Sequence, residues 1–168
     1  MTNTSTTPAQ GRASVIDAAS LQGLKSSLRG RLIGPGDEGY DAARMVPNAM
    51  IDKKPAVIVR CAGAADVINA VNFARTHNLL VAVRGGGHSV SGKSVCDGGI
   101  LIDFSLMKGI RVDPSRRTVR AQPGLRLGEF DRETQAFQLA TTMGLQSDTG
   151  IAGLTLGGAL VGSMANMV

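Results

Sequence analysis

The sequence has few aromatic residues and few residues that bind metals or form disulfides. Tyr, Phe and Trp together make up 3% of the 168 residues and tryptophan is absent, so base stacking on a nucleic acid has little support. The two histidines and the two cysteines have no companions at metal-ligand spacing, so no metal site is expected. Cys61 and Cys96 are interpreted as free, buried thiols in a reducing compartment.

Long apolar runs and a strong net charge are also missing. No apolar stretch approaches the ~20 residues of a membrane span, so no membrane partner is expected. Residues 1–12 are rich in Ser and Thr and lack the apolar region of a secretory signal, which favours the cytoplasm. The net charge of +5 comes from dispersed arginines. It suits solubility or a small anionic ligand, and no nucleic-acid partner is expected.

Glycine is the residue that the sequence has in excess. It accounts for 22 of the 168 residues, about twice the usual share of roughly 7%. The glycines cluster between Gly85 and Gly99 and again between Gly144 and Gly162. Such clusters indicate backbone in unusual conformations, or backbone pressed against another group, and they are more typical of ligand sites than of scaffolds.

The first half of the chain shows the hydrophobic pattern of a parallel unit. Residues 1–34 are expected to form a flexible lead with a helix over 14–29, and residues 35–168 the domain itself, which opens with a loop-rich connector. Strands are predicted over 56–59 and 80–83, joined by a helix that Asp66 caps. These two strands should be parallel and buried.

The second half changes character. A strand is predicted over 100–103, then a hairpin whose turn begins at Asp113-Pro114, and then a helix over 127–137. A parallel beginning followed by hairpin strands predicts an α+β fold of two small α/β subdomains with a cleft between them.

Residues 84–89 read Arg-Gly-Gly-Gly-His-Ser and follow a predicted parallel strand. Ligands of open sheets bind at the carboxyl ends of such strands. Successive glycine N–H groups can form an anion nest for a pyrophosphate, to which Arg84 would add charge and Ser89 a hydroxyl. The segment matches neither the dinucleotide GxGxxG fingerprint nor the P-loop. A plain glycine-rich turn with a satisfied histidine is the alternative.

A second segment, residues 147–158, again mixes glycines with Ser and Thr. By itself it is typical of a helix-packing segment with small residues. The two segments flank the predicted hairpin, and we therefore interpret them as two walls of one nucleotide cleft.

These segments resemble, in order and spacing, the FAD-binding domain of the p-cresol methylhydroxylase/vanillyl-alcohol oxidase superfamily. The resemblance covers residues 35–160 and includes Asp97-Gly98-Gly99, and it is to the berberine-bridge-enzyme-like branch. It implies a PCMH-type FAD-binding fold with FAD in the cleft. It also implies an FAD-linked oxidoreductase, in which hydride passes from a small organic substrate to the flavin and oxygen accepts the electrons.

The resemblance also implies site residues. His88 stands where the family carries a histidine bonded covalently to the 8α-methyl carbon of the flavin. Gln146 stands where some members have a second, cysteinyl link, so a single link is expected. The expected FAD-binding residues are Arg84, Gly85, Gly86, Gly87, His88, Ser89, Gly92, Ser147, Asp148, Thr149, Gly150, Ile151, Gly153, Leu154, Gly157 and Gly158.

No catalytic residue is expected among the remaining polar groups. His77 is interpreted as a structural residue at a helix C-terminus, and Asp97, Asp103 and Asp113 as turn and strand-end residues. Tyr40, in the connector, is no candidate base.

Members of this family are much longer, and their substrate pocket and catalytic base follow the FAD domain. A small-molecule substrate is therefore expected only for a full-length version, and the isolated chain is expected to be inactive. Residues 159–168 depart from the family's usual continuation, and the loss of one base from a plausible coding sequence would produce them. We hypothesise a truncated or frameshifted product, with a genuine small-residue helix as the alternative. A non-catalytic flavin- or nucleotide-binding module and a non-functional product remain open.

Overall fold

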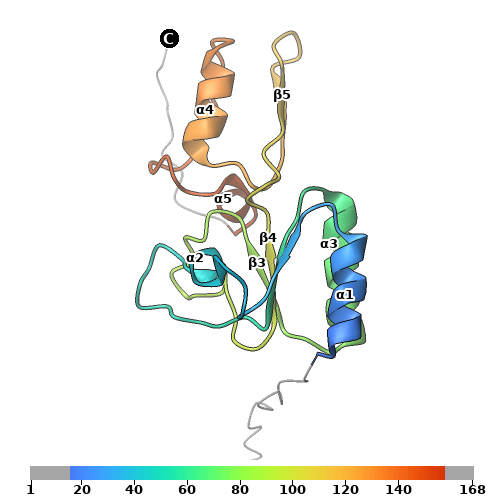
Figure 1. Ribbon diagram of the computed structural model, residues 1–168. Coiled ribbons are helices and arrows are strands. Elements are labelled where there is room, and N and C mark those ends of the chain that lie inside the picture. The colour runs from blue at the N-terminus through green and yellow to red at the C-terminus, as the bar shows by residue number, and fades with distance from the viewer. Residues whose placement is uncertain (1–15, 158–168) are drawn as a thin grey trace, which may run out of the picture.

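The computed structural model describes residues 16–157, which form two packed parts (Figure 1). The first part is a sheet with helices on both faces, and the second is a hairpin with two helices. Residues 1–15 of the expected N-terminal lead, and the segment 158–168 with Gly158, lie outside the described residues.

The sheet of the first part has the strand order β1-β2-β4-β3. Strands β2, β4 and β3 are parallel, whereas β1 pairs antiparallel with β2 at the edge. The apolar runs of the sequence therefore form strands where they were predicted. The strands are β1 (Arg31–Ile33), β2 (Val57–Arg60), β3 (Val81–Arg84) and β4 (Ile100–Asp103).

The predicted parallel pair is correct in direction but not in burial. β4 lies between β2 and β3, so Leu101 is in register with Ile58 on one side and with Ala82 on the other. β3 is consequently an edge strand, and Val81 and Val83 remain 41% and 48% exposed. The expectation that both strands are buried is wrong for β3, because helices and loops cover only one of its faces.

Both faces of the central strands are covered. Helices α1 (Ala18–Ser27) and α3 (Ala64–Thr76) lie side by side on one face, and α2 (Tyr40–Arg44) lies on the other (Figure 1). Side chains alternate along β2, so Val57 and Val59 pack towards α1 and α3 while Ile58 packs towards α2. This two-sided burial explains why the first three residues of β2 and of β4 are all apolar.

The N-terminal segment is tied into this sheet. α1 begins at Ala18, later than the predicted helix, because the Asp17 carboxylate caps it by accepting from the Ser20 N–H at 2.8 Å. α1 then packs against α3, and β1 pairs with β2.

Asp66 does not cap α3 as predicted, because the N-cap position is taken by Gly63. The Asp66 carboxylate, 1% exposed, instead accepts backbone N–H groups from Ala62 and, far away in sequence, from Arg29 and Gly30. Burial alone would raise the pKa of Asp66, but these hydrogen bonds outweigh it and lower the pKa. Asp66 thus joins the turn after α1 to the start of α3.

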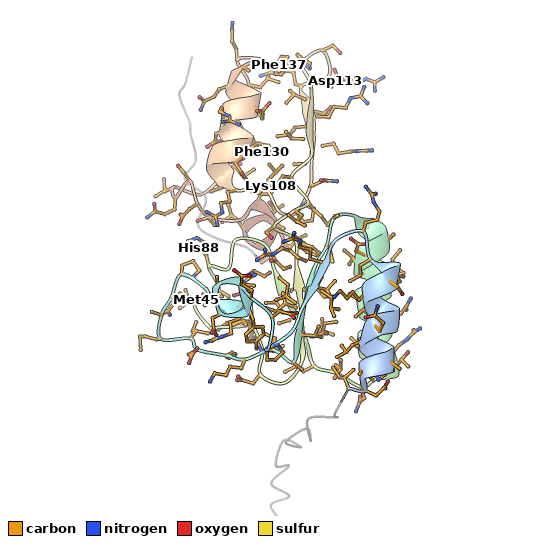
Figure 2. All side chains as sticks on the ribbon, in the orientation of Figure 1. Met45, His88, Lys108, Asp113, Phe130 and Phe137 are labelled. Carbon is orange, nitrogen blue, oxygen red and sulfur yellow. The ribbon has the colours of Figure 1, made fainter. Side chains whose placement is uncertain are left out.

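The second part contains the predicted hairpin, formed by β5 (Ile110–Asp113) and β6 (Thr118–Ala121). α4 (Leu127–Gln135) packs against the hairpin, and Figure 2 shows Phe130 between them. Residues 147–149 form a turn, and the second glycine segment continues into a short helix, α5 (Ile151–Gly157), which lies between the two parts in Figure 1.

Candidate functional site

The two glycine segments meet backbone to backbone. A Cβ atom added at Gly86 would lie 2.8 Å from the Cα of Gly150, and a Cβ added at Gly150 would lie 2.8 Å from the Cα of Gly86. Real Cβ atoms essentially never approach other atoms this closely, so both positions need glycine. The sequence expectation that the two segments lie side by side is confirmed.

The first part of α4 holds the second segment in place. The Leu127 N–H donates to Thr149 O at 2.9 Å, and the Ile151 N–H donates to Leu125 O at 3.0 Å. Arg126 and Gly150 form an isolated β-bridge between these two bonds. The hairpin part of the chain thus presents Gly150 to the loop that follows β3.

A cavity of about 660 Å³ opens where the two segments meet. Its volume lies within the usual range of small-molecule sites, about 300–1,000 Å³. Ten of the expected residues line it, namely Gly85, Gly86, Gly87, His88, Ser89, Thr149, Gly150, Gly153, Leu154 and Gly157. Residues from β3, the loop after it, and α5 therefore share one cavity.

The backbone of residues 85–90 can bind an anion. Within residues 16–157, the N–H groups of this stretch donate to no protein acceptor, although each residue lines the cavity. Gly87 adopts φ +79, a left-handed conformation that favours glycine, and its carbonyl accepts a hydrogen bond from the Ser94 hydroxyl at 3.3 Å. A run of free N–H groups of this kind is a typical anion nest.

Arg84 does not place its charge in the cavity. Its guanidinium is turned towards the sheet, where it contacts Asp103 Oδ2 at 2.9 Å and donates to Met45 O at 3.1 Å. The carboxylate of Asp103, which is 0% exposed, also accepts a hydrogen bond from Arg60 Nε at 3.1 Å. The structure thus gives Arg84 a buried ion pair in place of the free charge expected from the sequence.

Asp103 is more than the strand-end residue expected from the sequence. Burial alone would raise the pKa of Asp103, but the hydrogen bond and charge of Arg84, with smaller contributions from Ser105 and Arg60, outweigh it and lower the pKa. The ionised carboxylate therefore anchors the end of β3, from which the glycine loop departs.

Four cavity residues were missed by sequence reasoning, namely Val83, Val90, Lys93 and Ser94. Lys93 is the one Lys or Arg that lines the cavity within residues 16–157. Its backbone N–H donates to Ser89 Oγ at 3.1 Å, so it belongs to the same loop as the histidine. The sequence could have indicated Lys93, because it lies only four residues after Ser89 and the loop continues beyond residue 89.

His88 faces the second segment across the junction of the two parts. Figure 2 places it at this junction, and its Nε2 lies 3.3 Å from Oδ2 of Asp148. The side chains of His88 and Asp148 are 31% and 57% exposed. Asp148, expected from the sequence to bind the cofactor, thus contacts the histidine while lying outside the cavity lining.

The other expected residues have different surroundings. Gly92 packs against Ile51, and Ile151 is buried in the core of the second part. Ser147 and Asp148 line a neighbouring depression of about 410 Å³ together with Lys108 and Arg126.

The remaining histidine and the cysteines lie apart from the cavity lining. His77 follows α3 and packs its ring against Phe73, with 4.3 Å between ring centroids. Cys61 and Cys96 are buried in the cores on opposite faces of the sheet. Burial raises the pKa of the Cys61 thiol to about 12 and also raises that of Cys96.

The described part of the chain shows neither a metal-binding cluster nor a membrane-spanning helix. Residues 16–157 contain no group of three or more His, Cys, Asp or Glu side chains arranged to hold a metal ion. None of the helices in that range has the length and apolar character that crossing a bilayer requires.

Comparison with known proteins identifies the fold and the ligand. Residues 55–167 match the family model described as the FAD binding domain. The chain belongs to this family. (R)-6-hydroxynicotine oxidase of Paenarthrobacter nicotinovorans is 35% identical over 132 residues, which are 79% of this chain and 29% of the relative. An FAD-linked oxidoreductase of Dictyostelium discoideum is 39% identical over 135 residues, 80% of this chain and 29% of the relative.

Solved structures agree. The crystal structure of 6-hydroxy-D-nicotine oxidase from Arthrobacter nicotinovorans matches with a TM-score of 0.75 and 34% identity, over 76% of this chain and 28% of that one. Wild-type BBE-like 1 of Physcomitrella patens matches with a TM-score of 0.75 and 27% identity, over 81% of this chain and 30% of that one. The chain is therefore the PCMH-type FAD-binding domain found in berberine-bridge-enzyme-like FAD-linked oxidoreductases, and it spans less than a third of the length of these relatives.

The described residues fit FAD as a ligand. Gly86 and Gly150 line the cavity and let the two backbones meet there without intervening side chains. The free N–H groups of residues 85–90, with Lys93 in the same lining, suit the negative charges of a pyrophosphate.

Proposed function

We propose that the cavity between the two glycine segments binds FAD, with the pyrophosphate against residues 85–90 and His88 as a single covalent tether. The observation that carries this proposal is the stretch of free backbone N–H groups along one wall of the 660 Å³ cavity. Backbone donors are fixed by the fold, so little ordering is needed when an anion binds.

The charge of the ligand is balanced by Lys93 in this proposal. Arg84 is already paired with Asp103, and within residues 16–157 no other Lys or Arg lines the cavity. The apolar side chains of Val83, Val90 and Leu154 in the same lining offer packing surface for the uncharged rings of the ligand.

Bound FAD would supply a two-electron acceptor for hydride. The chain itself would bind and orient the cofactor, and hold it through His88. We propose that the full-length protein oxidises a small organic substrate and that dioxygen accepts the electrons. The name of the relative (R)-6-hydroxynicotine oxidase supports the choice of acceptor.

The 168-residue chain alone would be inactive as an oxidoreductase. The titratable side chains that line the cavity within residues 16–157 are His88 and Lys93, and both are assigned to binding. No described carboxylate or tyrosine lines the cavity to accept a substrate proton. A non-catalytic flavin-binding module is the alternative, and substrate-dependent bleaching of a bound flavin in a full-length protein would separate the two.

The cysteines bear on where the protein is found, and the cavity bears on its partners. Two free, buried thiols support a reducing compartment such as the cytoplasm. The proposed partners are FAD and, for the full-length protein, a small-molecule substrate, with no nucleic acid.

The test is a titration of the flavin-free chain with FAD, followed by flavin fluorescence. We expect saturable binding that ADP and inorganic pyrophosphate compete away and that riboflavin does not. Lys93→Met should weaken FAD binding about tenfold, roughly 1.4 kcal/mol, and Lys93→Arg should retain most of it. Lys25→Met, on an exposed surface of α1 away from the cavity, is the matched control.

Covalent attachment is tested on the same samples. Wild-type protein should keep its flavin after acid precipitation, whereas His88→Ala should release it. Absence of FAD binding, or binding that neither ADP nor pyrophosphate affects, would contradict the proposed site.

A further inference from the structure

The contact between His88 and Asp148 joins the two glycine segments through side chains. The 3.3 Å separation is between Nε2 of the imidazole and Oδ2 of the carboxylate. Asp148 is one residue before Thr149, whose carbonyl is held by the Leu127 N–H, so the backbone that carries the carboxylate is anchored to α4. The contact therefore joins two backbone segments that the fold already holds in place.

The carboxylate is directed to the histidine although cations are near. Asp148 borders the 410 Å³ depression with Lys108, Arg126 and Arg132. Within residues 16–157, Lys108 pairs with Glu129, Arg132 pairs with Glu133, and the only ion pair of Asp148 is with His88. Arg126 lines the same depression and forms no ion pair with Asp148 within these residues, so the carboxylate meets the histidine and not this guanidinium.

A carboxylate beside one ring nitrogen decides where the imidazole proton lies. A neutral imidazole carries its proton on one nitrogen and a lone pair on the other, and a carboxylate can only accept a hydrogen bond. With Asp148 at Nε2, the proton stays on Nε2 and Nδ1 keeps the lone pair. Contacts of this kind are often long before a ligand binds and shorten in the complex.

We propose that Asp148 is a positioning residue that keeps the proton of His88 on Nε2 and thereby directs the covalent flavin bond to Nδ1. The proposal rests on the proposed function, because it assumes that His88 is the tether. It goes beyond it by naming the ring nitrogen that reacts and the residue that selects it. An aspartate holds the imidazole of serine hydrolases in the reactive tautomer in the same manner.

The bond that forms joins Nδ1 of His88 to the 8α-methyl carbon of FAD. That carbon loses one hydrogen as a proton, and the imidazole is positively charged until it gives up its Nε2 proton. The negative charge of Asp148 stabilises this cation, which then releases its Nε2 proton to water. Two electrons remain on the flavin, and dioxygen takes them together with the two protons, which gives hydrogen peroxide and the oxidised, attached flavin.

The tautomer is tested without any flavin. In the flavin-free chain, the nitrogen and carbon chemical shifts of His88 distinguish a proton on Nε2 from a proton on Nδ1. We expect the Nε2–H form alone in the wild type and in Asp148→Asn, whose side-chain oxygen can still accept a hydrogen bond from Nε2. Asp148→Ala should show a mixture of the two forms.

The covalent step is tested by following attachment over time. Samples of chain with FAD in air are acid-precipitated at intervals, and the flavin peptide is then examined by mass spectrometry and NMR to identify the bonded nitrogen. We expect attachment through Nδ1 in the wild type. Asp148→Asn should slow attachment about tenfold or more with the same linkage, because its amide oxygen can still accept from the Nε2–H while the negative charge is removed. Asp148→Ala should be slow and give both linkages.

Two controls isolate the role of Asp148. Asp131→Asn makes the same chemical change on α4, where the carboxylate forms no ion pair within the described part of the chain, and should leave the attachment rate unchanged. Non-covalent FAD affinity, measured in a His88→Ala background, should change less than twofold on adding Asp148→Asn.

Each outcome has a consequence. Attachment through Nε2 in the wild type, or an unchanged attachment rate in both Asp148 variants, overturns the role of Asp148. Reversible FAD binding with no attachment in the wild type overturns it as well, but leaves FAD binding intact. If the Nε2–H form is lost in Asp148→Ala yet no variant binds FAD, the pair exists and the proposed function is what fails.

Discussion

Adding a single methyl group at Gly86 tests the meeting of the two glycine segments. In Gly86→Ala the new Cβ would lie 2.8 Å from the Cα of Gly150 and closer still to its nitrogen, whereas ordinary van der Waals contact begins at 3.4 Å. The segments must therefore separate by 0.6 Å or more. The neighbouring atoms are backbone, so no flexible side chain can move aside to relieve the overlap.

Separation of the segments has a cost in stability and in binding. Overpacking of this kind usually costs about 1–3 kcal/mol, and here it also strains the Arg126–Gly150 bridge. We expect Gly86→Ala to lower the free energy of unfolding by about 2 kcal/mol. The same displacement widens the cavity, and we expect FAD affinity to fall at least tenfold, about 1.4 kcal/mol. Gly150→Ala should behave alike, because the overlap is reciprocal.

The assay combines urea unfolding, followed by circular dichroism, with the FAD titration. Gly23→Ala is the matched control, because this glycine is inside α1 and a Cβ there would meet no atom within 4 Å. It should stabilise the chain by about 0.5–1 kcal/mol and leave FAD binding unchanged. Gly86→Ala with wild-type stability and wild-type FAD affinity would refute the proposed contact.

Three further predictions concern buried groups. Asp103→Asn should destabilise the chain at neutral pH by about 3–5 kcal/mol. Because folding lowers the Asp103 pKa, the difference in unfolding free energy between wild type and variant, measured by urea unfolding, should shrink as pH falls below about 4 and persist above it. Cys61 and Cys96 should not react with a thiol reagent until urea unfolds the chain, because burial raises both pKa values; rapid native labelling would contradict their burial. Tyr40→Phe removes the 2.6 Å hydrogen bond to Pro55 O and should cost about 1–2 kcal/mol in urea unfolding, whereas an unchanged midpoint would show that this carbonyl needs no partner.

Much of the secondary structure was predictable from local pattern. The apolar runs of β2 and β4 and the Asp-Pro turn of the hairpin carry signals that neighbouring residues alone produce. β1 was not predicted, because Arg31–Ile33 is three residues long and is a strand only through its pairing with β2. The exposure of β3 was also missed, because strand order in a sheet depends on residues far away in sequence.

The candidate site was likewise predictable in part from the sequence. Glycine content and hydroxyl residues identified both segments, and ten of the residues expected from them line one cavity. Lys93 and Ser94 were missed, because a loop's path into a cavity depends on distant anchors. One such anchor is Lys53, whose Nζ donates to Gly92 O at 2.8 Å.

The sequence by itself predicted two places where bare backbone would meet another group, because clustered glycine indicates such places, and its resemblance named the ligand as FAD. The tertiary structure decided which charges remain available. It pairs Arg84 with Asp103 and brings Lys93 into the cavity. It also sets Asp148 against His88 across 60 residues of chain. The physical reason is that a charge acts through distance in space, and only the folded backbone determines which charges are neighbours.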